Sequence, residues 1–174
     1  MRVGLDVGGT KTDAVAIDRD GRIVARSRHA TGWGPDAIAA TIMDVVAELA
    51  EAARVAASDL DAIGIGMPGQ VEPGTARVVH AVNLGVAELD LAAAIGPVFG
   101  VPVRAENDVK AAALGAWALH GAGVRGDGSD GSASLGAVLR DGSLRDDAPA
   151  LRGVTGGRTT AYLNLGTGVA AGIV

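Results

Sequence analysis

The sequence predicts an α/β fold in which helices flank a mixed β-sheet that opens with a three-stranded meander. Three observations lead to this prediction. The first thirty residues form short apolar stretches separated by polar turns, with no helical period. Beyond them, segments with helix and strand patterns alternate as far as residue 120. The length of 174 residues suits one domain with a further piece of chain.

The meander and the helix after it are predicted from local patterns. Strands are expected at residues 3–7, 14–17 and 22–27, joined by polar, glycine-containing turns. Pro35 is a favourable first helical residue. After it, apolar side chains recur every three or four positions, at Ile38, Ile42, Val45, Val46, Leu49 and Ala53. This period predicts an amphipathic helix with one buried face.

The rest of the chain is expected to alternate and then change in character. Strands are predicted at residues 62–67 and 101–105, and helices at residues 89–99 and 109–120. Residues 121–158 are rich in glycine, with a hairpin expected only around residues 140–143. Long loops of this kind are functional or disordered, and we expect a mobile insertion rather than an ordered lid.

Two strands, at residues 162–165 and 169–174, are predicted to follow the insertion. The expected organisation is therefore a domain over residues 1–120, an insertion over residues 121–158, and the first hairpin of an incomplete second domain over residues 159–174.

Composition excludes several classes of function. The chain has 15 Lys and Arg against 20 Asp and Glu, a net charge of −5, and neither sign is concentrated, so no nucleic-acid partner is expected. With no cysteine, thiolate catalysis and cysteine-bound metals are excluded from this sequence. Neither a long apolar run nor a secretory signal occurs, so we expect a cytoplasmic protein without a membrane partner. The histidines lack metal-ligand spacing and are expected in surface or packing roles: His29, His80 and His120.

Glycine patterns that suggest dinucleotide binding do not have the context that such binding needs. The pattern Gly-x-Gly-x-x-Gly occurs at residues 64–69 and 121–126, and a relaxed form occurs at residues 166–171. Its mechanism requires a preceding strand and a following helix, whose N-terminus holds the pyrophosphate. Residues 70–74 cannot open a helix, and a strand follows residue 168. No Walker A loop occurs at the first glycine turn either, because Thr10 separates its glycines from Lys11.

A different phosphate site fits the first turn. Residues 6–12 join two antiparallel strands without a large apolar side chain in the turn. Successive N–H groups in such a turn can bind an anion, and threonine and lysine add donors and positive charge. Gly166-Thr167-Gly168 offers a second turn of this kind. Asp6 could hold Mg²⁺ directly or through water. The alternative is that both turns are ordinary hairpins.

The order of the motifs resembles that of the ROK family of bacterial sugar kinases and regulators, which belongs to the actin-like ATPase superfamily. The motifs are DVGGTKT at residues 6–12, GIGMPGQV at 64–71, Asn83-Leu84, ENDVKAAALG at 106–115 and LNLGTGVAAGI at 163–173. The resemblance covers nearly the whole chain apart from residues 121–158. It implies an actin-like ATPase (ribonuclease H-like) domain.

The resemblance also implies a role for each motif. Asp108 would be the catalytic base and would bind the sugar together with Gly69, Asn83 and Asn107. Asp6 would lie near the metal, Mg²⁺. Gly166, Thr167 and Gly168 would form one phosphate loop for ATP. The other phosphate loop would comprise Gly8, Gly9, Thr10, Lys11 and Thr12.

The chemistry of Asp108 and Asn107 suits these roles. A carboxylate can accept the proton of a sugar hydroxyl during phosphoryl transfer, and an amide offers both a donor and an acceptor to neighbouring hydroxyls. Asp108 also suits the N-cap of the helix predicted after it, and both roles can hold together. Trp33 is interpreted as a loop anchor rather than a sugar-stacking platform, and Trp117 as a core residue.

Within its own length, the chain departs from the family pattern at Lys110, at Ala170 and at residues 85–87. Lys110 stands where Asn is frequent, and we favour a solvated helix residue over a phosphate partner. Ala170 replaces a glycine. Residues 85–87 are Gly-Val-Ala where the family usually has Pro-Gly-Trp, which bears on the role of Asn83.

The function implied by the resemblance is ATP-dependent phosphorylation of a hexose at the 6-hydroxyl. Candidate sugars are glucose, N-acetylglucosamine and N-acetylmannosamine. The complete protein is expected to be a homodimer, and a structural Zn²⁺ site is expected only in a C-terminal part beyond residue 174. The chain by itself is expected to lack activity, because adenosine contacts are missing. The alternatives are a sugar-responsive ROK regulator, which needs a DNA-binding domain ahead of Asp6, and a truncated non-catalytic binding module.

Overall fold

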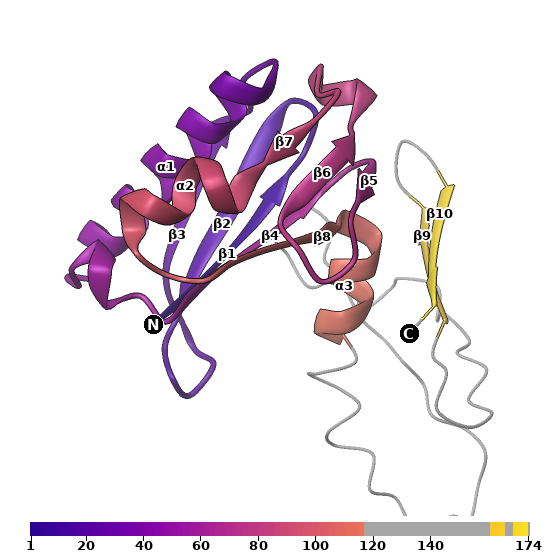
Figure 1. Cartoon of the computed structure of the whole chain (residues 1–174). Coiled ribbons are helices and arrows are strands. Elements are labelled where there is room, and N and C mark those ends of the chain that lie inside the picture. Colours follow the sequence, from indigo (N-terminus) through magenta and orange to yellow (C-terminus); the bar gives the residue numbers. More distant parts are fainter. Residues whose placement is uncertain (117–160, 166–168, 174) are drawn as a thin grey trace, which may run out of the picture. The chain divides into compact units, whose positions relative to one another are not determined.

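The computed structural model describes residues 1–116, 161–165 and 169–173 (Figure 1). The chain divides into two compact units, Met1–Asp108 and Val109–Val174. The first unit is built on a five-stranded sheet with the strand order β3-β2-β1-β4-β8. Its strands are β1 Arg2–Val7, β2 Lys11–Ile17, β3 Ile23–Ala30, β4 Ala62–Met67 and β8 Val103–Asn107.

The pairing of these strands confirms the predicted mixed sheet with an opening meander. β1 is antiparallel to β2, and β2 is antiparallel to β3. β4 is parallel to both β1 and β8. Parallel neighbours need a crossover connection, and the two helices α1 Pro35–Ala52 and α2 Leu91–Phe99 lie in these connections.

Several strands differ from their predicted bounds, and in two of them the difference matters for the site, because pairing with a neighbour decides where a strand ends. β2 begins at Lys11, three residues before the predicted start, since Lys11 pairs with Ala30 of β3. β8 extends as far as Asn107, which pairs with Met67 of β4. Both shifts place predicted site residues on strands rather than in loops.

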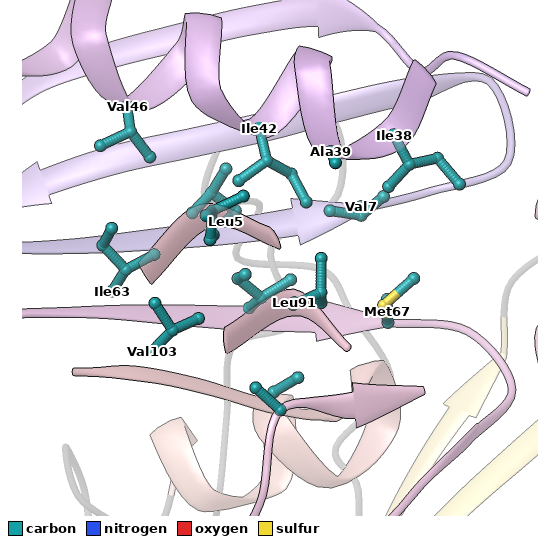
Figure 2. Close-up of a cluster of buried hydrophobic side chains, with 14 of the residues drawn as sticks. Leu5, Val7, Ile38, Ala39, Ile42, Val46, Ile63, Met67, Leu91 and Val103 are labelled. Atoms are coloured by element: carbon teal, nitrogen blue, oxygen red, sulfur yellow. The ribbon is translucent and has the colours of Figure 1, made fainter. Parts of the chain in front are cut away.

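The core lies between this sheet and the two helices (Figure 2). Alternate residues of β1 and β4 face it, among them Leu5 and Ile63. From α1, the buried residues follow the predicted period: Ile38, Ala39, Ile42, Val45, Val46, Leu49 and Ala50. Burial of each large apolar side chain stabilises the fold by about 1.5–3 kcal/mol. This stripe therefore holds α1 on the sheet.

A second, three-stranded sheet has the order β5-β6-β7. Its strands are β5 Gln70–Val71, β6 Arg77–His80 and β7 Leu89–Asp90, and short 3-10 helices occur at Ala57–Asp59 (η1) and Val82–Leu84 (η2). The helix predicted at residues 89–99 was wrong at its start, since Leu89 pairs with Val78 in β7. Asp90 accepts a hydrogen bond from the Ala93 amide at 3.0 Å and caps α2, which begins one residue later.

In the second unit, the helix α3 spans Asp108–Ala116, with Asp108 as the last residue of the first unit. The strands β9 Ala161–Leu165 and β10 Val169–Ile173 pair antiparallel, which confirms the predicted hairpin. The predicted insertion at 121–158, its hairpin at 140–143, the end of the helix at 117–120, Trp117 and His120 lie outside the described residues. No helix among the described residues is both long and apolar enough to cross a membrane.

Candidate functional site

The candidate site begins at the carboxyl ends of three parallel strands. In the sheet register Asp6 of β1 lies beside Gly66 of β4, and Gly66 lies beside Glu106 of β8. Because side chains alternate along a strand, this row points to the face opposite the core residues. Asp108 follows β8 directly. The topology therefore brings Asp6 close to Asp108, although the two residues come from separate motifs.

The charges around Asp6 reflect this proximity. Partial burial of its carboxyl group raises the pKa of Asp6, and the negative charges of Asp108 and Asp13 raise it further, while Lys11 opposes them. Although Asp6 as a residue retains solvent access, the surrounding strand ends remove part of the water around its carboxylate. A cation at this place would relieve the repulsion between the carboxylates.

The residues fit a magnesium ion for which water or phosphate supplies most of the ligands. Within the described part of the chain, no group of three His, Cys, Asp or Glu side chains could hold a metal ion together. Mg²⁺ commonly uses one or two carboxylates and retains several waters. Asp6, a solvent-accessible carboxylate next to the glycine turn, can serve as such a ligand.

The turn between β1 and β2 is closed by its own backbone. The Gly8 amide donates to the Lys11 oxygen at 2.9 Å. A Cβ added to Gly8 would lie 3.0 Å from that same oxygen, and a Cβ on Gly9 would lie 3.7 Å from the main-chain oxygen of Asn83. Neither glycine has a left-handed φ. A side chain at Gly8 would crowd the Lys11 oxygen, whereas one at Gly9 would make an ordinary contact. The turn also lies beside Asn83, a residue from another predicted motif.

The polar residues of this turn have different environments. Thr10 is exposed, whereas Thr12 is fully buried and its hydroxyl shares a hydrogen bond of 2.8 Å with the Thr31 hydroxyl. The Lys11 Nζ lies 3.5 Å from Asp13 Oδ2. Thr12 therefore supports the turn from inside, while Thr10 and Lys11 face solvent.

Gly69 connects the other predicted sugar-binding residues. It has a φ of +95°, and a Cβ there would lie 2.1 Å from the His80 oxygen and 2.9 Å from Ala81 Cα. Asn107 donates its side-chain amide to the Gly69 oxygen at 3.1 Å. Gly69 is thus bonded to Asn107 on one side and packs on the segment leading to Asn83 on the other. Only glycine fits this position.

The structure places the predicted residues Asp6, Gly8, Gly9, Thr10, Lys11, Thr12, Gly69, Asn83, Asn107 and Asp108 in the first unit, while Gly166, Thr167 and Gly168 lie outside the described residues. Two supporting residues were missed by the sequence prediction. The Glu106 carboxylate accepts a hydrogen bond from the main-chain amide of Asn107 at 2.9 Å, and the Thr31 hydroxyl shares a hydrogen bond with that of Thr12. Glu106 lies within the motif at residues 106–115, so the sequence offered a signal for its supporting role. The sequence offered none for Thr31, because its bond joins β2 to the segment after β3.

The antiparallel meander, the parallel strands after it and the glycine turn between β1 and β2 are those of an actin-like ATPase domain. The chain belongs to the ROK family, whose model matches residues 2–125.

Relatives include enzymes and a regulator. The chain is 33% identical over 150 residues to a glucokinase of Streptomyces coelicolor, a match over 82% of this chain and 46% of the relative. A ROK family glucokinase from Streptomyces griseus, solved in complex with glucose and AMPPNP, matches with a TM-score of 0.68 and 30% identity, over 99% of this chain and 44% of its own. The xylose repressor of Bacillus subtilis is 28% identical over 114 residues, 65% of this chain and 29% of the repressor. The chain spans less than half the length of each of these relatives.

Proposed function

We propose that the protein carrying this chain transfers a phosphoryl group from ATP to the 6-hydroxyl of a hexose, with Asp108 as the general base. The placement of Asp108 near Asp6, at the carboxyl ends of the parallel strands β1, β4 and β8, supports this proposal most directly. Kinship with glucokinases, one of them solved with glucose and AMPPNP, supports the substrate classes.

In the proposed reaction, the Asp108 carboxylate accepts the proton of the sugar hydroxyl as its oxygen attacks the phosphorus atom. Asn107 would bind neighbouring sugar hydroxyls through its amide. The bond from Asn107 to the Gly69 oxygen restricts this amide to one orientation. Orientation of this kind lowers the barrier because the reacting groups are held in place before reaction.

The segment of residues 8–12 would hold the β- and γ-phosphates of ATP through main-chain amides other than that of Gly8, which is bonded to Lys11, and Thr10 and Lys11 would aid it. Asp6 would hold Mg²⁺, which when bound supplies positive charge against the phosphoryl oxygens. From the resemblance, Gly166-Thr167-Gly168 would form a second phosphate turn.

The finer assignments belong to the same proposal. The sugar is glucose or a related hexose such as N-acetylglucosamine or N-acetylmannosamine. The complete protein acts in the cytoplasm as a homodimer, and any structural Zn²⁺ is bound outside this sequence. The domain over residues 1–120 supplies the base and the sugar site, and residues from 159 onward begin a second domain.

Substitution of the base tests this function. In the whole protein, Asp108→Asn should lower kcat for glucose phosphorylation by a factor of about 10² to 10⁴, because the proton acceptor is lost. Asn suits a helix start as well as Asp does, so the fold should persist. The matched control is Asp90→Asn, at the start of α2, which should leave kcat unchanged. Wild-type turnover in Asp108→Asn would overturn the role of base.

A sugar-responsive regulator is the second candidate, favoured by the kinship with the xylose repressor. A mobility-shift assay of the whole protein with operator-like DNA duplexes distinguishes the two candidates. Specific, salt-sensitive DNA binding together with absent turnover would favour the regulator. Sugar binding with neither turnover nor DNA binding would instead indicate a non-catalytic binding module.

A further inference from the structure

Trp33 is unusual because most of its surface is exposed and yet it makes a close backbone contact. The side chain is 71% exposed. A Cβ added to Gly85 would lie 2.6 Å from both Cε2 and Nε1 of the indole. The ring therefore rests directly against Gly85, and a side chain added there would have to displace the indole.

Gly85 ends the turn that carries Asn83. It has a φ of +67° and follows the 3-10 helix η2, where it donates its amide to the Val82 oxygen at 3.0 Å. Ala81 and Val86 close this turn with two reciprocal backbone bonds of 2.9 and 3.1 Å. Leu84, within the turn, is fully buried. The residues 81–86, here called the Asn83 turn, thus form one closed unit on which the indole lies.

The segment around Trp33 also contacts residues 8–12, here called the phosphate turn because of their proposed role. The Gly34 amide donates to the Leu84 oxygen at 2.8 Å, next to the indole. Two residues before Trp33, the Thr31 amide donates to the Thr10 oxygen at 3.1 Å, and the Thr31 hydroxyl bonds that of Thr12. Residues 31–34 therefore join the turn at residues 8–12 to the Asn83 turn.

We propose that Trp33 is a positioning residue that holds the Asn83 turn in place and thereby sets the affinity for the sugar. This inference rests on the proposed function for its sugar readout. Without the indole, the Asn83 turn loses its cover over Gly85, although it keeps the backbone bond from Gly34 to the Leu84 oxygen. Small displacements of a positioning group can cost large factors in binding and rate.

The contact itself is tested by a cycle of thermal stabilities. Gly85→Ala should lower the melting temperature more than Gly100→Ala, because Gly100 has the same φ of +67° and also ends a helix, but has no atom within 4 Å of an added Cβ. In a Trp33→Ala background, Gly85→Ala should cost no more than Gly100→Ala. An unchanged difference between the two glycine variants in that background would overturn the contact.

The positioning role is tested by sugar affinity and hydrogen exchange on the whole protein, at a temperature where every variant is folded. Trp33→Ala should raise the dissociation constant for glucose, measured by calorimetry, by roughly tenfold. It should have little further effect in an Asn83→Ala background, if Trp33 acts through that turn. Amides of residues 82–86 should exchange faster, while those of α2 keep their protection. Val98→Ala, a control at a side chain that is 60% exposed on α2, should change neither readout.

The outcomes separate the two proposals. An unchanged dissociation constant in Trp33→Ala, or unchanged exchange in residues 82–86, would overturn the positioning role even if the enzyme is an active kinase. Wild-type protein that binds no tested hexose would overturn the proposed function, and the exchange measurement then decides by itself whether Trp33 holds the turn. Equal effects of Trp33→Ala in the wild-type and Asn83→Ala backgrounds would overturn action through that turn.

Discussion

Asn107 donates its side-chain amide to the main-chain oxygen of Gly69 at 3.1 Å and so joins the end of β8 to the turn after β4. The pairing of β4 with β8 stops at Met67 and Asn107, so this bond extends the connection between the two strands into the turn after β4. It also ties the residue next to the proposed base to the segment that packs on the Asn83 turn.

Gly69→Ala should destabilise the protein strongly. The added Cβ would lie 2.1 Å from the His80 oxygen, and a backbone atom cannot move aside as a flexible side chain can. We expect a loss of at least about 3 kcal/mol in the free energy of unfolding, from strain and displacement together. Urea denaturation measures it. Gly21→Ala is the control, since its φ is +81° but nothing lies within 4 Å, and it should cost about 1 kcal/mol. Equal losses would contradict the close approach.

Asp6→Asn should raise the melting temperature at neutral pH when Mg²⁺ is removed by a chelator. Burial and the charges of Asp108 and Asp13 raise the pKa of Asp6, so the folded state binds a proton more tightly than the unfolded chain does. Ionised Asp6 therefore destabilises the fold, and stability increases as pH falls through the folded pKa.

The difference between Asp6→Asn and wild type should therefore vanish below the ordinary aspartate pKa of about 4. Thermal unfolding at several pH values measures the difference. Asp44→Asn, at an exposed position of α1, is the control and should give no such trend. A melting temperature that falls at neutral pH in Asp6→Asn would contradict the raised pKa.

Thr31→Val should destabilise the phosphate turn by leaving the buried Thr12 hydroxyl without its partner. An unpaired buried hydroxyl costs about 1–3 kcal/mol. Thr31→Ser keeps the hydroxyl and should cost less. Chemical denaturation of Thr12→Val, Thr31→Val and the double variant gives the coupling, and the double variant should lose less than the sum of the single losses. Strict additivity would contradict the bond of 2.8 Å between the two hydroxyls.

Glu48→Gln should lower the melting temperature slightly at neutral pH. The bond from His29, at 2.5 Å, lowers the pKa of Glu48. A carboxylate with a lowered pKa stabilises the fold above its unfolded pKa and loses this effect as pH falls through the folded one. The difference from wild type should therefore disappear in acid. Glu51→Gln, on the same helix, is the control. A difference that persists in acid would show that the bond depends little on the charge of Glu48.

Local patterns determined much of this protein. The period of α1 predicted its buried face, since Ile38, Ile42 and Leu49 contact the core through the geometry of a single helix. The alternation within β1 and the glycine turn after it predicted the start of the meander, because these patterns too involve only residues close together in the sequence. The order of short motifs was sufficient to indicate the family.

Tertiary structure decided the features that depend on residues distant in sequence. The two-residue strands β5 and β7 carry no period of their own, and pairing with β6 creates them. The neighbourhood of Asp6 and Asp108 comes from the parallel register of β1, β4 and β8. The same holds for Trp33 on Gly85 and for Asn107 on Gly69. Sequence patterns report which face of an element is apolar, whereas these contacts depend on which elements become neighbours, and only the folded chain decides that.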